Sequence, residues 1–459
     1  MAKPMKDLIV VLPGIMGSVL SNDDGPIWQM SGGAAWKFLI SGGGSLRDLD
    51  LPIDDPDVND GVFASGLMQD LHVIPGLLAV DGYTGLTDML TTYYRVEKLD
   101  GEPLNIVEFP YDWRRRLAST AAAFEEFIWQ RLARWREHSP GAQLILVCHS
   151  MGGLVARYWA EQTWGRNTNQ WGDVRALITF GTPHRGSLNA LRFLTEGIRI
   201  PVFPDLTDMV RTLPGLYHLL PTFPSVQVDG AELTIPHTLA IPGLEPTLSA
   251  DALAFHTELA DLAAVHPDPW GKIHTFLGAE QKTRLWASST KGVFTYYETP
   301  APGASDFLNS GDGTVPQLSS MPTPGQWAAE TAIAEQHGSL HINENNLVAL
   351  RQRIDALQYG ISAFTPEAAA VDDLRVRWEE WFPTGSDVTA FVGTGTDSPT
   401  DIHITVTSAD DPAFLPLVLD VDVPAEGADI TIGSLPDGRY RALIQSGIAS
   451  DVHAVFGVA

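Results

Sequence analysis

The stretch LILVCHSMGGLVARYW, Leu144 to Trp159, restricts the local fold more than any other part of the chain. An apolar run typical of a buried strand is followed by Ser150, a glycine pair and a helical pattern. A tight turn between a strand and a helix strains the serine backbone and exposes the hydroxyl, so Ser150 is a candidate nucleophile. On this stretch alone the alternative is an ordinary N-terminal helix cap.

One residue departs from the usual strand-serine-helix pattern G-x-S-x-G. Small residues two positions before and after the serine normally prevent a collision within the turn. Gly152 fills the second position, whereas Cys148 stands in the first, where glycine is usual. We expect the local backbone to show how the fold makes room for this side chain.

Apolar runs separated by helical patterns predict an α/β fold with a mostly parallel sheet. The clearest helical pattern is Ala121 to Glu137, whose apolar residues recur at spacings of four, four and three. Five runs show little polar alternation, which is typical of buried parallel strands: Leu8 to Leu12, Leu104 to Phe109, Leu144 to Val147, Ala176 to Phe180 and Ile273 to Leu277.

Two segments depart from this alternation. Within residues 186–270 many prolines interrupt an apolar sequence, which predicts an insertion of short helices over the sheet. The insertion is either a cap or lid, or an elaboration of the packing. Residues 61–94 form either a second piece of cap or an ordinary crossover connection.

The last part of the chain has a different periodicity. After about Pro366, six runs alternate apolar and other residues with a period of two, as in strands with one buried face. We therefore expect a small C-terminal all-β domain, most simply an immunoglobulin-like sandwich. A chain of 459 residues has room for two domains, which we place at residues 1–365 and 366–459.

Charge and cysteine content restrict the partners and the compartment. The formal net charge is -27, from 29 basic and 56 acidic residues, and it repels nucleic acid. The only cysteine, Cys148, excludes an intrachain disulfide, and the first apolar run is too short for a signal peptide. We expect a cytoplasmic protein. No histidine and carboxylate cluster has the spacing of a metal site, so we expect neither a metal nor a cofactor.

A nucleophilic serine needs a base and an orienting acid, which in this type of fold follow in the order Ser, Asp, His. GDGTVP supplies Asp312, and EQHGSLH supplies His337, 25 positions later. The alternatives are a turn residue for Asp312 and a surface loop histidine for His337. His341 competes as the base, but we favour His337 because a helix-like sequence follows shortly after it.

The oxyanion formed during acyl transfer needs backbone amide donors. The amide of Met151, directly after the serine, is the first candidate. The second is Ile15 or Met16 in VLPGIMGS, a glycine-rich loop after the first predicted strand, which could otherwise be a simple turn.

Two further motifs attract attention, but we interpret both as structural. In FPYDWRRR we expect Asp112 to pair with neighbouring arginines and fix the loop rather than to act in catalysis. The strand-serine-helix turn expected at Ser150 is called a nucleophile elbow, and the helix that follows it leads to the next predicted strand. In GTPHRGS, His184 comes directly after that strand, where this type of fold does not place its base.

Six motifs in this order resemble the lecithin:cholesterol acyltransferase and phospholipid:diacylglycerol acyltransferase family of α/β hydrolases, in its bacterial lipase-like branch. The resemblance covers roughly residues 7–360 and rests on these motifs: PGIMGS, FPYDWR, HSMGG, FGTPHRGS, GDGTVP and QHGSL. It implies an α/β-hydrolase fold with helical cap insertions and a Ser150, Asp312, His337 triad. The disulfides of the secreted animal members are ruled out here by the single cysteine.

The resemblance also implies transfer of a fatty acyl group from a lipid ester to water or to an alcohol. Such a substrate would bring transient contact with a membrane. The sequence leaves the acceptor and the substrate-binding residues open. The rival hypothesis is an interaction or effector protein, whose C-terminal β module recruits a partner protein and whose esterase, thioesterase or amidase activity acts on a non-lipid substrate or is absent.

Overall fold

The computed structural model describes most of the chain, in two parts that together bury three apolar cores. The described residues are 2–29, 49–69, 72–74, 78–162, 170–198, 205–265, 271–301, 310–322, 329–359, 374–378, 381–393, 399–425, 427–447 and 451–458. The predicted domain boundary between residues 365 and 366 lies outside these ranges.

A six-stranded sheet forms the centre of the larger part, and all its strands run parallel. Its order is β16-β13-β11-β10-β1-β9. The strands span β1 Leu8–Leu12, β9 Ile106–Glu108, β10 Leu144–His149, β11 Val174–Phe180, β13 Ile273–Gly278 and β16 Ala329–Ile333. The five predicted runs coincide with five of them. Strand β16 was not predicted, because it is an edge strand whose AETAI sequence mixes apolar and polar residues.

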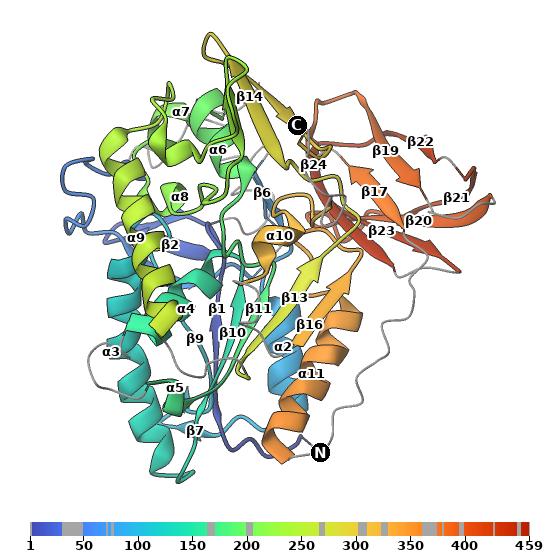
Figure 1. The fold of residues 1–459 in the computed structure, drawn as a ribbon. Coiled ribbons are helices and arrows are strands. Elements are labelled where there is room, and N and C mark those ends of the chain that lie inside the picture. The colour runs from blue at the N-terminus through green and yellow to red at the C-terminus, as the bar shows by residue number, and fades with distance from the viewer. Residues whose placement is uncertain are drawn as a thin grey trace.

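Helices cover both faces of this sheet, as Figure 1 shows. Alternate residues of β1 enter different cores: Leu8 and Val10 pack in the core beneath helices α3 and α4, and Ile9 and Val11 in the core beneath α2 and α11. The helices are α2 Thr84–Tyr93, α3 Leu117–Arg136, α4 Met151–Gln162 and α11 Glu344–Tyr359. The chain has the predicted α/β-hydrolase fold, and helix α3 begins four residues before the predicted Ala121.

The proline-rich segment forms several helices: α6 Leu188–Glu196, α7 Thr207–Val210, α8 Pro214–Tyr217, η3 Pro236–Thr238 and α9 Pro246–Val265. Figure 1 shows α6, α7 and α8 beyond the carboxyl ends of the strands, whereas α9 packs beside α4. The expectation of short helices was wrong for α9, which has 20 residues. Pro246 is the first residue of α9, where its missing N–H costs no helical hydrogen bond.

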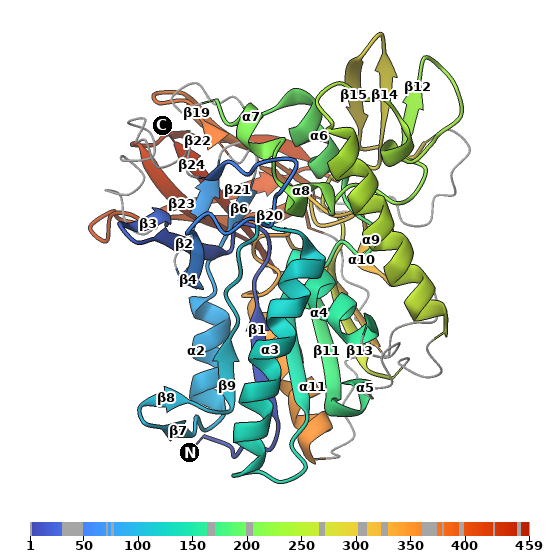
Figure 2. The ribbon, with the colours of Figure 1, turned by 90° about the vertical axis from the view of Figure 1, so that its left-hand side faces the viewer.

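A small sheet combines one strand of the proline-rich segment with two strands beyond residue 270, the limit expected for the insertion. It joins β12 Val226–Val228, β14 Trp286–Thr290 and β15 Val293–Tyr297, which lie side by side in Figure 2. Strand β12 comes from the proline-rich segment, whereas β14 and β15 follow β13. Distant parts of the sequence therefore build one covering unit.

The described residues within 61–94 form a strand, a hairpin and a helix. Their first strand joins a second small sheet, whose members are β2 Ser18–Asn22, β3 Gly25–Trp28 and β4 Phe63–Leu67. A hairpin of β5 His72–Ile74 and β6 Leu78–Val80 follows, and then α2, which packs under the central sheet. The short elements elsewhere are β7 Lys98–Leu99, β8 Glu102–Pro103, α5 Gln170–Asp173 and α10 Gln317–Ser320.

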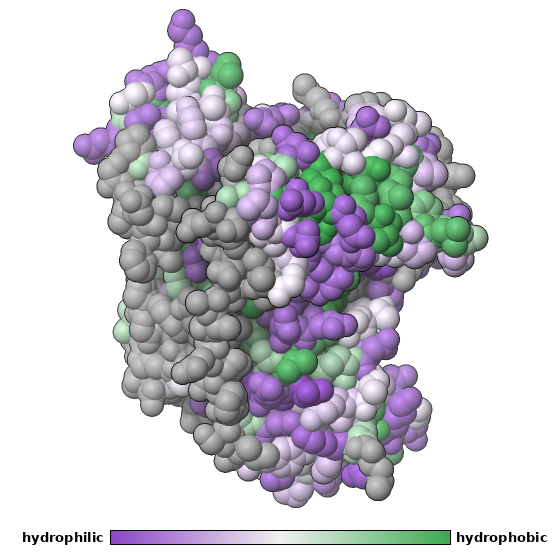
Figure 3. Space-filling view, turned by 90° about the vertical axis from the view of Figure 1, so that its right-hand side faces the viewer, coloured by the Kyte–Doolittle hydropathy of each residue, from purple (hydrophilic) through white to green (hydrophobic). Residues whose placement is uncertain are grey.

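The C-terminal part consists of two β-sheets with a core of their own. The sheet orders are β17-β19-β22 and β18-β24-β23-β20-β21. The strands are β17 Arg375–Trp378, β18 Trp381–Phe382, β19 Asp387–Gly393, β20 Thr400–Ser408, β21 Leu417–Val423, β22 Ala428–Ser434, β23 Gly438–Ser446 and β24 Val452–Val458. All six predicted runs form strands. Figure 3 shows an apolar area on the surface of this part.

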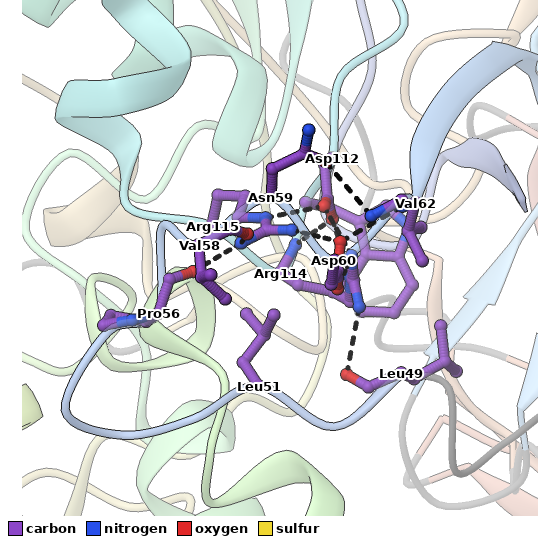
Figure 4. A network of polar contacts seen from close by, with 12 residues as sticks. Leu49, Leu51, Pro56, Val58, Asn59, Asp60, Val62, Asp112, Arg114 and Arg115 are labelled. Carbon is purple, nitrogen blue, oxygen red and sulfur yellow. Dashed lines mark hydrogen bonds and ion pairs between the residues drawn. The ribbon is translucent and has the colours of Figure 1, made fainter.

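Asp112, Arg114 and Arg115 form a polar network in the loop before α3 (Figure 4). The fully buried Arg114 bonds to both oxygens of Asp112, at 2.9 and 2.7 Å, and pairs with Asp60 at 2.9 Å. Arg115 donates to the carbonyls of Pro56 and Val58, each at 2.7 Å. The network joins residues 49–62 to the loop before α3, which is the structural role expected for FPYDWRRR.

We expect Arg114→Met to lower the free energy of unfolding by about 3 kcal/mol, because it removes the fully buried cation that pairs with Asp112 and Asp60 and leaves Arg115 as the arginine partner of both. Urea denaturation measures this loss. Arg95→Met is the matched control, because Arg95 and its partner Glu97 are exposed and such pairs contribute less than about 1 kcal/mol. Equal effects of the two substitutions would contradict a special role for the buried network.

Candidate active site

The candidate site lies at the carboxyl ends of the central strands, where open parallel sheets place their ligands. Ser150 directly follows β10, Gly14 lies in the loop after β1, and His337 comes four residues after β16. Asp312 lies in a turn beside the extension of β13, to which an isolated bridge with Gln281 connects it. Four separate segments therefore meet at this edge.

Ser150 has the backbone expected of a strained turn. Its φ is 50°, outside the extended conformation of an ordinary N-cap, and its amide donates to the carbonyl of Phe180 at 2.8 Å. A side-chain carbon at Gly152 would lie 2.4 Å from the carbonyl oxygen of Pro13, so only glycine fits there.

Cys148 fits because its side chain points into the core beneath α3 and α4, away from this contact. It is in register with Leu12 and Thr179 as the last but one residue of β10. Burial raises the pKa of the Cys148 thiol well above its ordinary value, so the group stays protonated and unreactive. The departure from the glycine pattern costs no distortion of the strand.

The three side chains predicted to form a triad lie in one hydrogen-bonded chain. His337 Nε2 lies 3.0 Å from Ser150 Oγ, and His337 Nδ1 lies 2.7 Å from Asp312 Oδ2. All three residues are buried, which strengthens these interactions because little water competes for them. With Nδ1–H donating to the carboxylate, Nε2 is left as the acceptor for the serine hydroxyl.

Asp312 is also the turn residue that the alternative interpretation expected. Its Oδ1 accepts hydrogen bonds from the amides of Thr314 and Val315, at 2.9 and 2.6 Å. The amide of His337 donates to the Asp312 carbonyl at 2.8 Å. The turn therefore orients Oδ2 toward the imidazole, and the backbone bond fixes the distance between the two segments.

The two other histidines considered as bases lie elsewhere. His341 Nε2 donates to the carbonyl of Gly82 at 3.2 Å, and its ring packs against Tyr83 and His149. Burial, followed by the charge of Arg157, lowers the pKa of His184 well below its ordinary value, so that ring stays neutral. Of the histidines considered as bases, His337 is the one hydrogen-bonded to Ser150 Oγ.

The glycine loop after β1 lies against the serine. A side-chain carbon at Gly14 would be 2.9 Å from Ser150 Cβ. The Gly14 amide donates to the Tyr83 hydroxyl at 2.7 Å and is therefore engaged. Ile15 and Met16 remain the candidate loop donors beside Met151, whose amide begins α4 and has no partner within that helix. Met16 has a φ of 61°, so the loop is strained here.

Two residues that were not predicted, Tyr83 and His149, join these parts. Burial raises the pKa of the Tyr83 hydroxyl, which accepts a hydrogen bond from the Gly14 amide and lies 2.9 Å from His149 Nδ1. The hydroxyl therefore donates its own hydrogen bond to Nδ1, and His149 Nε2–H donates to the His337 carbonyl at 3.1 Å. Only the position of His149 beside Ser150 hinted at this, since Tyr83 lies 69 residues from Gly14.

Within the ranges described above, no group of three or more histidine, cysteine or acidic side chains could hold a metal ion. The groups that the structure brings together at the site are a serine, a histidine and a carboxylate beside backbone amides. Among the described helices, none is long and apolar enough to cross a membrane.

Residues 91–236 match the family model described as lecithin:cholesterol acyltransferase. Over these residues the match agrees with the resemblance expected from the motifs. The matched segment carries the HSMGG motif of the elbow and the neighbouring FPYDWR and FGTPHRGS motifs of this family.

The chain is also similar to solved structures. The similarity to a protein in the crystal structure of the Tle4-Tli4 complex has 16% identity, covers 78% of this chain and 99% of that one, and has a TM-score of 0.55. At this identity it shows the fold alone. The similarity to phospholipase PlaB from Legionella pneumophila has 10% identity and covers 82% of this chain and 87% of that one. Its TM-score of 0.29 is too low to support a conclusion about this chain. A search of curated proteins found no match.

Proposed function

We propose that the protein is a serine acyl hydrolase or O-acyltransferase that acts on lipid esters. The observation that carries this proposal is the hydrogen-bonded chain from Ser150 through His337 to Asp312, at an elbow of the lecithin:cholesterol acyltransferase family. Serine, imidazole and carboxylate in this arrangement are the groups that acyl transfer requires.

Ser150 Oγ attacks the ester carbonyl carbon while its proton passes to His337 Nε2. The tetrahedral oxyanion takes hydrogen bonds from the amides of Met151 and of Ile15 or Met16, each worth about 3 kcal/mol where such donors were removed in other enzymes. His337 then gives its proton to the leaving alcohol as the carbon–oxygen bond breaks. Asp312 keeps Nδ1 protonated throughout.

The acyl-enzyme that remains can react with water or with an alcohol, and His337 again takes the proton of the attacking hydroxyl. Water gives a fatty acid, and an alcohol gives a new ester. The lipid substrate is supported by the family match and by the apolar cap helices over the strand ends.

The test uses a fluorophosphonate probe and long-chain p-nitrophenyl esters. The full chain should be labelled and should release the chromophore, whereas Ser150→Ala should not be labelled and should release the chromophore about 10⁶-fold more slowly. Absence of labelling in the folded wild type would favour the rival hypothesis of an interaction protein.

Product analysis after incubation with mixed phospholipids and acylglycerols, with and without an added alcohol, identifies donor and acceptor. A preference for short acetyl esters over long acyl chains would refute the lipid substrate while leaving the serine mechanism intact.

A further inference from the structure

The C-terminal β domain contacts the two loops that support the candidate site. The first loop runs from Asp81 to Tyr83, and the second from Glu335 to His341. Strand β24 lies beside the β5–β6 hairpin, which leads directly into the first loop (Figure 1). Ala334, at the start of the second, packs in the core of the β domain.

Arg441 of β23 makes the first polar contact. Its Nε donates to Asp81 Oδ1, although Arg441 itself is partly exposed and Asp81 is almost completely buried. A buried carboxylate is unfavourable unless a cation or hydrogen bonds compensate it, so Arg441 determines whether Asp81 is tolerated in this position.

Asp81 connects Arg441 to the loop of His337. The Asp81 amide donates to the carbonyl of Gly338, the residue after His337, at 3.1 Å. The next residue, Gly82, accepts the hydrogen bond of His341, and Tyr83 bonds to the oxyanion loop and to His149.

His453 of β24 makes the second polar contact. Its Nδ1 lies 2.9 Å from Glu335 Oε2, and its amide lies 3.1 Å from Oε1. Glu335 is fully buried two residues before His337, and its further partners are the Gln336 amide and the Asn343 side chain. In these bonds His453 is the partner of Glu335 that can carry a positive charge.

We propose that Arg441 and His453 are positioning residues, through which the β domain holds the loops of Tyr83 and His337 in the geometry needed for acyl transfer. The inference rests on the proposed function and assigns the β domain a part in the hydrolase site. A misplacement of about 1 Å in such a site can cost about 100-fold in rate.

The test compares His453→Gln, Arg441→Gln and the double variant with the full-length wild type. We expect kcat of the double variant to fall about 100-fold with KM within about 2-fold, because the loops hold the reacting groups rather than the acyl chain. Arg441→Lys, which keeps the charge, should restore most of the loss caused by Arg441→Gln. The control is His403→Gln, which breaks an exposed pair with Asp420 in the same domain and should leave kcat unchanged.

Hydrogen exchange gives a readout that does not depend on activity. The amides of Asp81 and His337 donate to Gly338 and Asp312, so they should exchange faster in either single variant than in His403→Gln. Unchanged exchange and unchanged kcat in a folded double variant would overturn the inference. Failure of the proposed function shows differently, as a wild type that the fluorophosphonate does not label.

A pH dependence separates a charged His453 from a merely packed one. Burial opposes its charge, but the hydrogen bond to Glu335 and the charges of Glu335, Asp81 and Asp451 outweigh burial and raise the pKa of His453. A raised folded-state pKa stabilises the protein below the unfolded value of 6.5, and this stabilisation disappears as the pH rises through the folded value. His453→Gln should therefore be more destabilising at pH 6 than at pH 9, and an equal effect at both would contradict the charged pair.

Discussion

Replacement of His337 by alanine is expected to lower kcat about 10⁶-fold, comparable to the loss on removal of the nucleophile, because serine and base act as one unit. His337 Nε2 lies 3.0 Å from Ser150 Oγ and takes its proton in the proposed mechanism. Release of p-nitrophenol from a long-chain ester and the rate of fluorophosphonate labelling both measure the loss.

His341→Asn is the matched control for this substitution. His341 is equally buried and close in sequence, but its Nε2 donates to the carbonyl of Gly82 rather than facing the serine. Its replacement disturbs the packing against Tyr83 and His149, so we expect a loss of at most about 100-fold. A larger loss for His341→Asn than for His337→Ala would reverse the assignment of the base.

Asp312→Asn is expected to lower kcat about 10⁴-fold by placing the imidazole proton on the wrong nitrogen. The amides of Thr314 and Val315 donate to Oδ1, so an asparagine keeps its carbonyl oxygen there and turns its NH₂ toward His337 Nδ1. Nδ1 must then accept, and Nε2 carries the proton and cannot accept from Ser150.

The control for Asp312→Asn is Asp88→Asn, the same chemical change at an exposed position of α2. Thermal unfolding of both variants establishes that the fold is intact. If Asp312→Asn kept activity within about 10-fold of the wild type, another group would have to orient the base.

Local sequence patterns are enough to predict most of the central sheet. Buried parallel strands need apolar residues on both faces, so β1, β10 and β11 stand out as unbroken runs. Strand β16 was not predicted because edge strands tolerate polar residues. Strands β14 and β15 were not predicted because their sheet pairs β14 with β12, which lies in a distant segment.

The candidate site divides in the same way. Chemistry and chain order selected Ser150, Asp312 and His337 from the sequence, since a nucleophile, an acid and a base are residue types with recognisable turn contexts. The choice between His337 and His341 depended on which ring faces Ser150, and this is set by the Asp312 turn and by backbone bonds that no local pattern encodes.

Neighbours along the chain were enough to predict the strand-serine-helix turn at Ser150, the separate β periodicity of the C-terminal part and the candidate acid and base. The folded chain was needed to show that Tyr83 and His149 connect the loop of Gly14 to His337, and that Arg441 and His453 reach Asp81 and Glu335. Such contacts join residues tens to hundreds of positions apart, and they exist only after the sheets have brought those segments together.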